Sequence, residues 1–228
     1  NAIKGHSRQY DLSALPRVTF TDPQVAAVGV TEAGERAKGV DVAVCARHRE
    51  SLDETAKALA NATGRRIVPI VADTTNWESV TRMVETTLTQ LGRIDVLVNN
   101  ASTPGGLVRG ALADADENAL LEDINTKVLG YLRCAKAVVP HMQQRGWGRI
   151  INIGGLSGRR SGNISGLRNA AIVHLTKTLA DQLGAHGITV NLVHPGATRT
   201  ERTDAETERR AAGNAIRRIV DAREIGQV

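Results

Sequence analysis

A chain of 228 residues, 41% of them hydrophobic, is long enough to bury a complete core, and one α/β domain of this size is ordinary. The net charge of +5 permits an anionic partner, but aromatic residues make up only 2% of the chain. Because base-stacking platforms need aromatic side chains, nucleic acid is not an expected partner. The two cysteines exclude a disulfide framework, and no cluster of metal ligands is expected.

The sequence has no segment typical of membrane insertion or export. No stretch approaches the roughly 18 consecutive apolar residues that a membrane-spanning helix needs. The N-terminus also lacks a basic segment followed by an apolar stretch and a small-residue cleavage site. A soluble, cytoplasmic protein without a membrane partner is therefore expected.

From residue 40 onward, short apolar segments rich in β-branched residues alternate with longer segments of helical periodicity. Their continuous apolar character predicts strands that are covered on both faces, as in a parallel sheet. The predicted strands are Val40–Cys45, Arg66–Val71, Ile94–Asn99, Arg149–Ile153 and Thr189–Val193. The alternation predicts an α/β fold with a doubly wound parallel sheet, a Rossmann-type three-layer αβα arrangement.

Several helix ends are indicated by local signals. Ser51–Glu54 and Thr75–Glu78 fit the capping box of a helix N-terminus, in which the first and fourth side chains bond the backbone reciprocally. Gly64, Gly92 and Gly184 stand where a left-handed C-terminal cap is expected.

The remaining organisation is simple, and residues 1–228 are expected to form a single domain. Residues 1–16 show no strong periodicity and are expected to form an irregular arm, while 199–218 predict a solvated helix or a mobile loop. Helices over 117–142 and 163–183 carry long apolar faces, which indicate packing in the core or between copies in a homo-oligomer.

Three motifs then appear in the right order. They are Asp95–Ser102 (DVLVNNAS), Asp123–Gly130 (DINTKVLG) and Val193–Thr200 (VHPGATRT). Together they resemble motifs of the short-chain dehydrogenase/reductase family. This resemblance covers about residues 40–228 and implies an NAD(P)-dependent oxidoreductase that transfers hydride between nicotinamide and a small-molecule carbonyl or secondary alcohol.

The candidate cofactor-binding residues lie just past the carboxyl ends of the predicted strands, where ligands bind on open parallel sheets. They are Arg47, Asp73, Asn99, Asn100, Ala101, Pro195, Gly196 and Thr198. Arg47 has no acidic residue at Cys45 or Ala46 beside it, which favours the 2′-phosphate of NADP over NAD. The alternatives are that Arg47 is a plain surface arginine and that Asp73 only stabilises a helix N-terminal turn.

The first strand departs from the family pattern. Where a glycine-rich turn is expected to approach the cofactor pyrophosphate, the sequence reads Val18–Gly29 (VTFTDPQVAAVG), with Asp22 near the expected phosphates. Residues 14–29 instead resemble the start of the dimerisation domain of mercuric and dihydrolipoyl reductases. No Cys-x4-Cys redox pair extends that resemblance, and the segment is a candidate surrogate first strand.

The catalytic positions also differ from the family pattern. The resemblance places Ser165 at the family's tyrosine, Asn169 at its lysine and Gly155 at its serine, and it keeps only the asparagine, Asn125. Ser157 or Ser161 is a candidate substitute for the missing serine. The candidate catalytic residues are therefore Asn125, Ser157, Ser165 and Asn169.

Three hypotheses follow for the function. The first is an oxidoreductase with altered catalytic residues, and the second is a catalytically silent dinucleotide-binding or dimer-forming protein. The third is an inactive truncated or chimeric product, because the chain stops near Asp221–Val228, where relatives continue into a last edge strand. Cofactor binding separates the third hypothesis from the other two.

Overall fold

The computed structural model describes residues 16–19, 25–28, 39–103, 106–108, 111–158, 163–199, 203–214 and 216–226. Five parallel strands form two hydrogen-bonded groups. The first pairs β3 (Val42–Ala46) with β4 (Ile67–Val71), and the second has the order β5 (Val96–Asn99), β6 (Gly148–Ile153), β7 (Ile188–Val193). The strands agree with the five predicted segments to within two residues at each end.

A short hairpin lies between the two groups. β1 (Pro16–Thr19) and β2 (Val25–Val28) pair antiparallel, and β2 contacts both β3 and β5. The facing edges of β3 and β5 border a space of about 560 Å³. β2 contacts both strands that border this space. The predicted arm, apart from Pro16, lies outside the described residues, as do Asp22 and Gly29.

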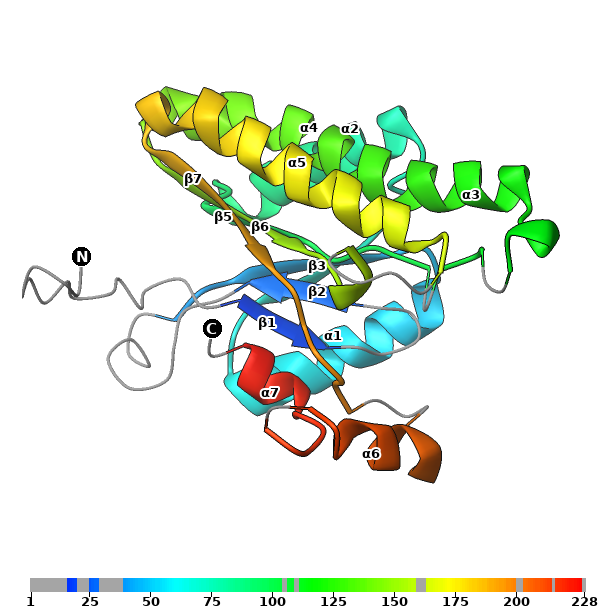
Figure 1. Ribbon diagram of the computed structural model, residues 1–228. Coiled ribbons are helices and arrows are strands. Elements are labelled where there is room, and N and C mark those ends of the chain that lie inside the picture. The colour runs from blue at the N-terminus through cyan, green and yellow to red at the C-terminus, as the bar shows by residue number, and fades with distance from the viewer. Residues whose placement is uncertain are drawn as a thin grey trace, which may run out of the picture.

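Helices cover both faces of the sheet (Figure 1). α2 (Trp77–Leu91), α4 (Gly130–Arg145) and α5 (Gly166–Leu183) lie on one face, and α1 (Arg49–Thr63) and α7 (Ala222–Ile225) lie on the other. The main core is packed between the first set of helices and the strands. Its fully buried side chains include Val80, Val138, Met142, Ile150 and Ile188. The predicted three-layer α/β fold is confirmed.

The structure confirms the predicted glycine caps at Gly64 and Gly92 and shows that the predicted cap at Gly184 and the two predicted capping boxes are wrong. Gly64 and Gly92 have φ of 66° and 80° and end their helices in the left-handed conformation. Gly184 has φ of −56°, because the short 3₁₀ turn η6 (Gly184–His186) extends the chain to Gly187, which takes the left-handed role with φ of 72°.

Both predicted capping boxes are wrong in position. α1 begins at Arg49, so Ser51 lies inside the helix, where its carbonyl oxygen accepts a hydrogen bond from Thr55. α2 is capped by Asn76, whose side chain accepts a hydrogen bond from the backbone N–H of Ser79 at 2.7 Å. Asparagine caps a helix as well as serine or threonine does, which explains the shift by one residue.

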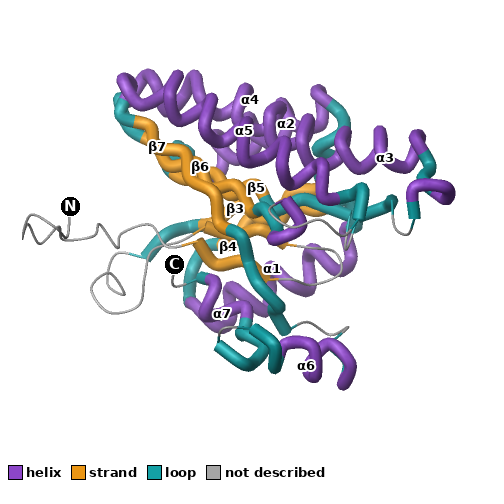
Figure 2. The backbone as a smooth tube through the Cα atoms, in the orientation of Figure 1, coloured by secondary structure: helices purple, strands orange, loops and turns teal. Residues whose placement is uncertain are grey.

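The predicted helix over 117–142 is divided into three parts. α3 (Glu117–Ile124) passes into the π-helical turn η4 (Asn125–Leu129), and α4 follows directly. Two 3₁₀ turns, η3 (Leu112–Asp114) and η5 (Leu156–Gly158), lie in the loops after β5 and β6. Figure 2 shows that the loop after β5 runs toward α3. The loop after β6 meets η4, because Lys127 Nζ donates to the carbonyl oxygen of Gly154.

After β7 the chain forms α6 (Ala205–Ala211) and α7. Within 194–199, 203–214 and 216–226 no further strand forms, and one parallel bridge joins Thr198 to Val220. In the part of the chain that the structure describes, no helix has the length and apolar character needed to cross a bilayer.

Candidate functional site

The carboxyl ends of four parallel strands bring the candidate residues to one edge of the sheet. Asp73 follows β4, Asn99 ends β5, Gly154 follows β6 and His194 follows β7. Because these strands are parallel within each hydrogen-bonded group, the segments after them open on the same side. A ligand crevice at this edge stays a prediction, and β3 and β5 are not hydrogen-bonded to each other within the described residues.

Asn99 belongs to a line of buried polar side chains that joins two strands to a helix. Its Nδ2 donates to Asn152 Oδ1 at 2.9 Å, and Asn152 Nδ2 donates to Thr176 Oγ1 at 2.9 Å. Thr176 Oγ1 in turn donates to the carbonyl oxygen of Ile172 on α5 at 2.7 Å. Because Asn99 Nδ2 is bonded to a side chain of the neighbouring strand, Asn99 positions β5 against β6.

Asn100 differs from Asn99, because its Nδ2 is buried and has no hydrogen-bond partner. Only 3% of the residue is exposed, and it stands at the end of β5 beside the half-buried Ala101. Leaving a buried amide donor unpaired costs about 1–3 kcal/mol. A polar group of a ligand that crosses the end of β5 would satisfy this donor.

Arg47 and Asp73 occupy different kinds of environment. Arg47 is exposed at the end of β3, with no hydrogen bond or ion pair to a described residue. Asp73 Oδ1 accepts from the backbone N–H and the hydroxyl of Thr75, both at 2.8 Å. Asp73 therefore stabilises the turn before α2, as the alternative interpretation holds, and its second oxygen is available to a ligand.

The segment after β7 contains Pro195, Gly196 and Thr198. Pro195 and Thr198 are half-buried, and Gly196 is exposed. The hydroxyl of Thr198 donates to the carbonyl oxygen of Gly196 at 3.2 Å. A side chain added at Gly196 would meet no atom within 4 Å, so packing among the described residues does not require glycine there. A ligand against the backbone is one reason for a glycine at such a place.

Ser157 and Asn169 are the two predicted catalytic residues that contact each other directly. Asn169 Nδ2 donates to Ser157 Oγ at 2.7 Å, and Asn169 is 4% exposed. Ser157 is half-buried in η5, and no described residue accepts its hydroxyl proton. That proton is therefore free to form a hydrogen bond with a ligand oxygen.

Lys127 completes this group from another element. Its Nζ donates to Asn169 Oδ1 at 2.9 Å and to the carbonyl oxygen of Gly154 at 3.3 Å. The side chain is buried, with 3% of the residue exposed. Burial and, less strongly, the nearby Arg168 lower the pKa of the Lys127 ammonium, and Asp123 partly opposes both effects, so that the pKa is about 7.

A buried ion pair lies beside Lys127. Arg168 Nη1 donates to Asp123 Oδ1 and, at 2.9 Å, to the carbonyl oxygen of Thr103. The two side chains are 7% and 0% exposed. Asp123 Oδ2 and Arg168 Nε have no hydrogen-bond partner. The ion pair joins α3, α5 and the loop after β5.

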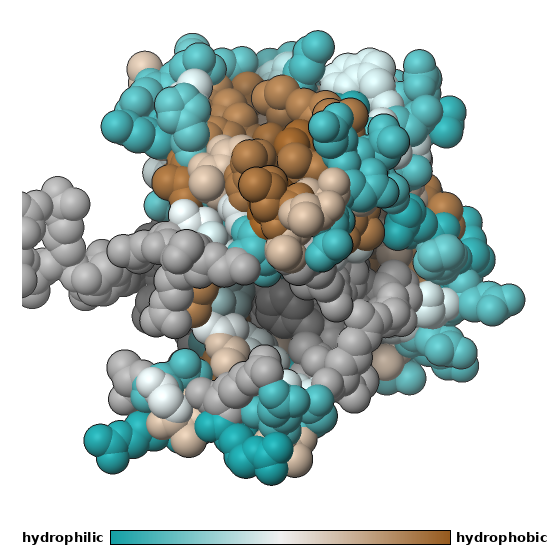
Figure 3. All heavy atoms as spheres, turned by 45° about the vertical axis from the view of Figure 1, so that its right-hand side comes forward, coloured by the Kyte–Doolittle hydropathy of each residue, from teal (hydrophilic) through white to brown (hydrophobic). Residues whose placement is uncertain are grey.

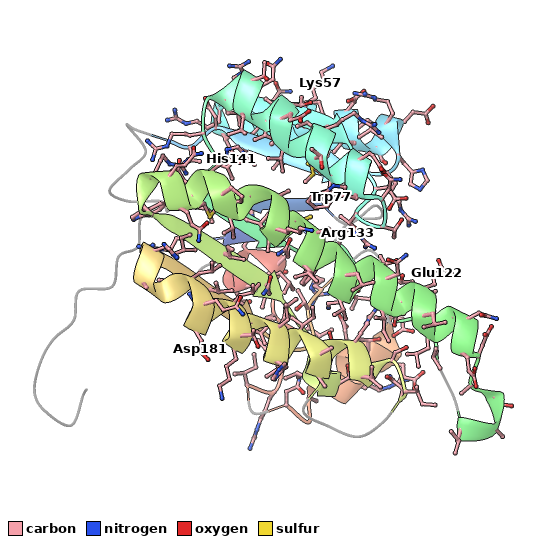
Figure 4. All side chains as sticks on the ribbon, turned by 90° about the horizontal axis from the view of Figure 1, so that it is seen from above. Lys57, Trp77, Glu122, Arg133, His141 and Asp181 are labelled. Carbon is pink, nitrogen blue, oxygen red and sulfur yellow. The ribbon has the colours of Figure 1, made fainter. Side chains whose placement is uncertain are left out.

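Ser165 and Asn125, the other two predicted catalytic residues, contact other parts of the chain. The Ser165 hydroxyl accepts from the backbone N–H of Val108 at 3.0 Å and donates to its carbonyl oxygen at 2.7 Å. Asn125 Oδ1 accepts from Arg133 Nη2 at 2.9 Å. Arg133 on α4 is labelled in Figure 4, where α2, α4 and α5 lie side by side.

Tyr131 is a packing residue, as its place in an amphipathic helix predicts. It is 1% exposed, and its hydroxyl donates to the carbonyl oxygen of Ile153 at 2.9 Å. Burial raises the pKa of this phenol. Tyr131 is the one tyrosine within the described residues, so no phenol there is placed to exchange a proton with a substrate.

The sequence analysis missed Lys127 and Asp123. A signal for both was present, because Asp123, Lys127, Tyr131 and Cys134 recur at helical spacing and all are buried. Two charged residues on the apolar stripe of a helix indicate a buried polar group that needs partners. His194, whose Nδ1 accepts from the backbone N–H of Gly155 at 3.0 Å, was also missed, and no sequence signal identifies it.

The lowered pKa of Lys127 predicts a pH-dependent contribution to stability. Between pH 7 and 10.5 the unfolded state binds a proton that the folded state does not, so this contribution to the free energy of unfolding rises with pH. Relative to Lys127→Met, the free energy of unfolding of the wild type should rise by up to about 1.4 kcal/mol per pH unit over this range. Urea unfolding at pH 7, 8, 9 and 10 measures this rise.

Lys57 on α1 provides the matched control for this measurement, because it is exposed (Figure 4). Lys57→Met should leave the pH dependence of unfolding as it is in the wild type. If the difference in the free energy of unfolding between wild type and Lys127→Met stays constant from pH 7 to 10, Lys127 keeps an ordinary pKa.

Comparison with known proteins identifies the family of the chain. Residues 34–211 match the family model described as short chain dehydrogenase. The chain is 36% identical over 175 residues to the short-chain reductase protein NovJ of Streptomyces niveus, covering 76% of this chain and 65% of that protein. It is 34% identical over 176 residues to a 3-oxoacyl-[acyl-carrier-protein] reductase of Synechocystis sp., covering 74% and 68%.

Among solved structures, the NAD+-bound xylitol dehydrogenase is similar, with a TM-score of 0.70 and 25% identity over 81% of this chain and 78% of that one. The chain spans slightly less than two thirds of the length of the first of these relatives. The family match begins after the segment that departs from the family pattern. Because that match covers well over half of the chain, this protein belongs to the short-chain dehydrogenase/reductase family.

Proposed function

We propose that this protein is an NAD(P)-dependent oxidoreductase that interconverts a small carbonyl compound and the corresponding secondary alcohol, with Ser157 holding the reacting oxygen. The observation that carries the proposal is the free hydroxyl proton of Ser157. Asn169 donates to Ser157 Oγ, so this hydroxyl is oriented while its own O–H remains available to a substrate.

The bound nicotinamide supplies or accepts the hydride. In the direction of reduction, the carbonyl carbon gains a hydride and the carbonyl oxygen gains one proton. A hydrogen bond from Ser157 stabilises the negative charge that develops on this oxygen. The proton itself comes from water, because within the described residues the Tyr131 hydroxyl is bonded to Ile153 and the Ser165 hydroxyl to Val108.

The described residues fit a dinucleotide at the carboxyl edge of the sheet. The unpartnered Nδ2 of Asn100 and the free oxygen of Asp73 are suited to polar groups of the cofactor. NADP is the favoured cofactor, because the exposed Arg47 directly follows β3 and has no acidic residue before it at Cys45 or Ala46. β2, placed between β3 and β5, supports a role for residues 14–29 as a surrogate first strand.

Arg47→Ala should weaken the binding of NADPH about tenfold or more and leave that of NADH nearly unchanged. A hydrogen bond to a charged group contributes about 1.5–3 kcal/mol, and 1.4 kcal/mol is a factor of ten in affinity. Fluorescence titration of both cofactors measures the two dissociation constants. Arg49→Ala is the matched control, since Arg49 already pairs with Asp53 at 3.5 Å. An equal loss for both cofactors would contradict the NADP preference.

The proposed reaction is tested in two stages. Cofactor titration comes first, followed by turnover of a panel of model ketones with NADPH and NADH. Reduction that Ser157→Ala slows by at least tenfold, with cofactor affinity unchanged, would support the proposal. Binding of the cofactor without turnover of any substrate would favour the second candidate, a catalytically silent dinucleotide-binding protein. The tied hydroxyl of Ser165 is the observation behind this second candidate.

A homo-oligomer remains a proposal, and the helix layer supports it. Large apolar side chains are exposed on α3 to α5, namely Leu121, Leu129, Leu132, Leu167 and Val173. Figure 3 shows a face on which hydrophobic residues gather among hydrophilic ones. Light scattering at several protein concentrations tests this proposal, and a monomer at high concentration would reject it.

A further inference from the structure

The buried Lys127 reaches the candidate site from an unusual place in the backbone. It is the third residue of η4, the π-helical turn that joins α3 to α4. A π turn inserts an extra residue into a helix, and such turns often occur at functional sites. From this turn the Lys127 side chain extends to Asn169 on α5 and to the loop after β6. The family resemblance places a lysine at position 169, where this chain has Asn169.

Lys127 is connected to Ser157 through one side chain. Asn169 accepts from Lys127 Nζ on its oxygen, at 2.9 Å, and donates from its nitrogen to Ser157 Oγ, at 2.7 Å. The positively charged Lys127 ammonium donates to the amide oxygen of Asn169 and polarises the amide. The amide nitrogen is then a stronger donor to Ser157 Oγ, because hydrogen bonds in a chain polarise one another. The same charge therefore makes the Ser157 hydroxyl a better donor to a substrate oxygen.

We propose that Lys127 is the positioning residue of the proposed reaction, and that its ammonium, acting through Asn169, strengthens the hydrogen bond from Ser157 to the substrate oxygen. The charge that the family carries on α5 thus comes from the α3–α4 junction in this chain. This inference rests on the proposed function, and it names the group that makes the reaction depend on pH.

Among the charged groups that the structure describes near the site, none fits this role equally well. Arg168 is held by Asp123 in the buried ion pair. His194 Nδ1 is occupied by the backbone N–H of Gly155. The groups that face Lys127 are Asp123 from α3, Arg168 from α5 and the ring of Tyr131 from α4 at 5.9 Å. Burial and Arg168 favour the neutral amine, so the Lys127 ammonium loses its proton close to neutral pH.

The pH profile of ketone reduction tests the proposal in the full chain. In the wild type, kcat should fall about tenfold or more as the pH rises through about 7, where Lys127 loses its charge. Lys127→Met should have a low kcat at pH 6 and no such fall, with the affinity for NADPH unchanged. Asn169→Leu should abolish the fall as well, because it removes the connection to Ser157 while Lys127 remains.

A second measurement is independent of turnover. In protein with 13C-labelled lysine, the Lys127 resonance is identified by its absence from Lys127→Met. It should titrate close to pH 7 in the wild type, at the same pH as the fall in kcat. This measurement and the wild-type profile remain informative even if a variant fails to fold. Lys57→Met, at an exposed position on α1, should leave both readouts unchanged.

The outcomes separate this inference from the proposed function. A fall in kcat that coincides with the Lys127 titration and disappears in Asn169→Leu would support the inference. Turnover with the same pH profile in wild type and Lys127→Met would overturn it and leave the proposed function intact. A Lys127 resonance that stays charged to pH 9 would also overturn it. Cofactor binding without any turnover by the wild type would overturn both proposals.

Discussion

Asp123→Leu should lower the free energy of unfolding by about 3–5 kcal/mol, the largest loss expected for a single substitution in this chain. The reason is that Arg168 would remain as a buried charge without its partner, since its side chain is only 7% exposed. Arg168→Met should have a similar effect, because Asp123 is fully buried. Urea unfolding followed by far-ultraviolet circular dichroism measures both losses.

Two controls make this first prediction specific. The double variant Asp123→Leu/Arg168→Met should be less destabilised than either single variant, because it leaves no unpaired charge. Arg93→Met, which breaks the exposed pair with Asp95, should cost less than about 1 kcal/mol. If the double variant lost the sum of the two single losses, the side chains would contribute independently and the ion pair would not be the cause.

Restoring the family's catalytic residues should fail in this chain. Ser165→Tyr should destabilise the fold by about 3 kcal/mol or prevent folding, because there is no room for a ring. Ser165 is 2% exposed, and a Cβ atom added at Gly106 would lie 2.3 Å from Ser165 Oγ, so the loop runs directly against the serine. Asn169→Lys would also place a second ammonium beside Lys127.

The measurement compares stability and ketone reduction in the wild type, Ser165→Ala, Ser165→Tyr and Ser165→Tyr/Asn169→Lys. Ser165→Ala should lose about 1–3 kcal/mol, because it leaves the backbone groups of Val108 without their partner. A folded double variant that reduces ketones faster than the wild type would show that the loop yields and that position 165 still faces the substrate.

The sheet and its helices were predictable because the pattern of apolar residues marks each of these elements. The continuous apolar segments from Val40 to Val193 marked all five parallel strands, and their alternation with helices fixed the layers. Helix ends were less predictable, since Asn76 and Thr75 are both good caps and only the backbone decides between them. The antiparallel pairing of β1 with β2 was not predicted, because no periodicity marks two strands of four residues.

The candidate site was predictable in its location and less so in its contacts. Strand ends fix where Asn100 and Gly196 lie, because backbone topology alone brings them to one edge. The direction of a side chain depends on packing that a single sequence does not show. The family resemblance therefore placed Ser165 at the position of the catalytic tyrosine, whereas its hydroxyl is hydrogen-bonded to the backbone of Val108. Lys127 lies within the Asp123–Gly130 motif, but no neighbouring residue in the sequence indicated that its partner would be Asn169 on α5.

The buried line from Asn99 through Asn152 to Thr176 also limits how the protein can change by mutation. A slip of β5 along β6 by one residue would turn the Asn99 amide to the other face of the sheet and break its hydrogen bond to Asn152. The register of β5 against β6 is therefore fixed in whole residue steps and cannot drift gradually. Insertions that alter substrate choice can be accommodated only in the loops beyond the strand ends, where they leave this alignment untouched.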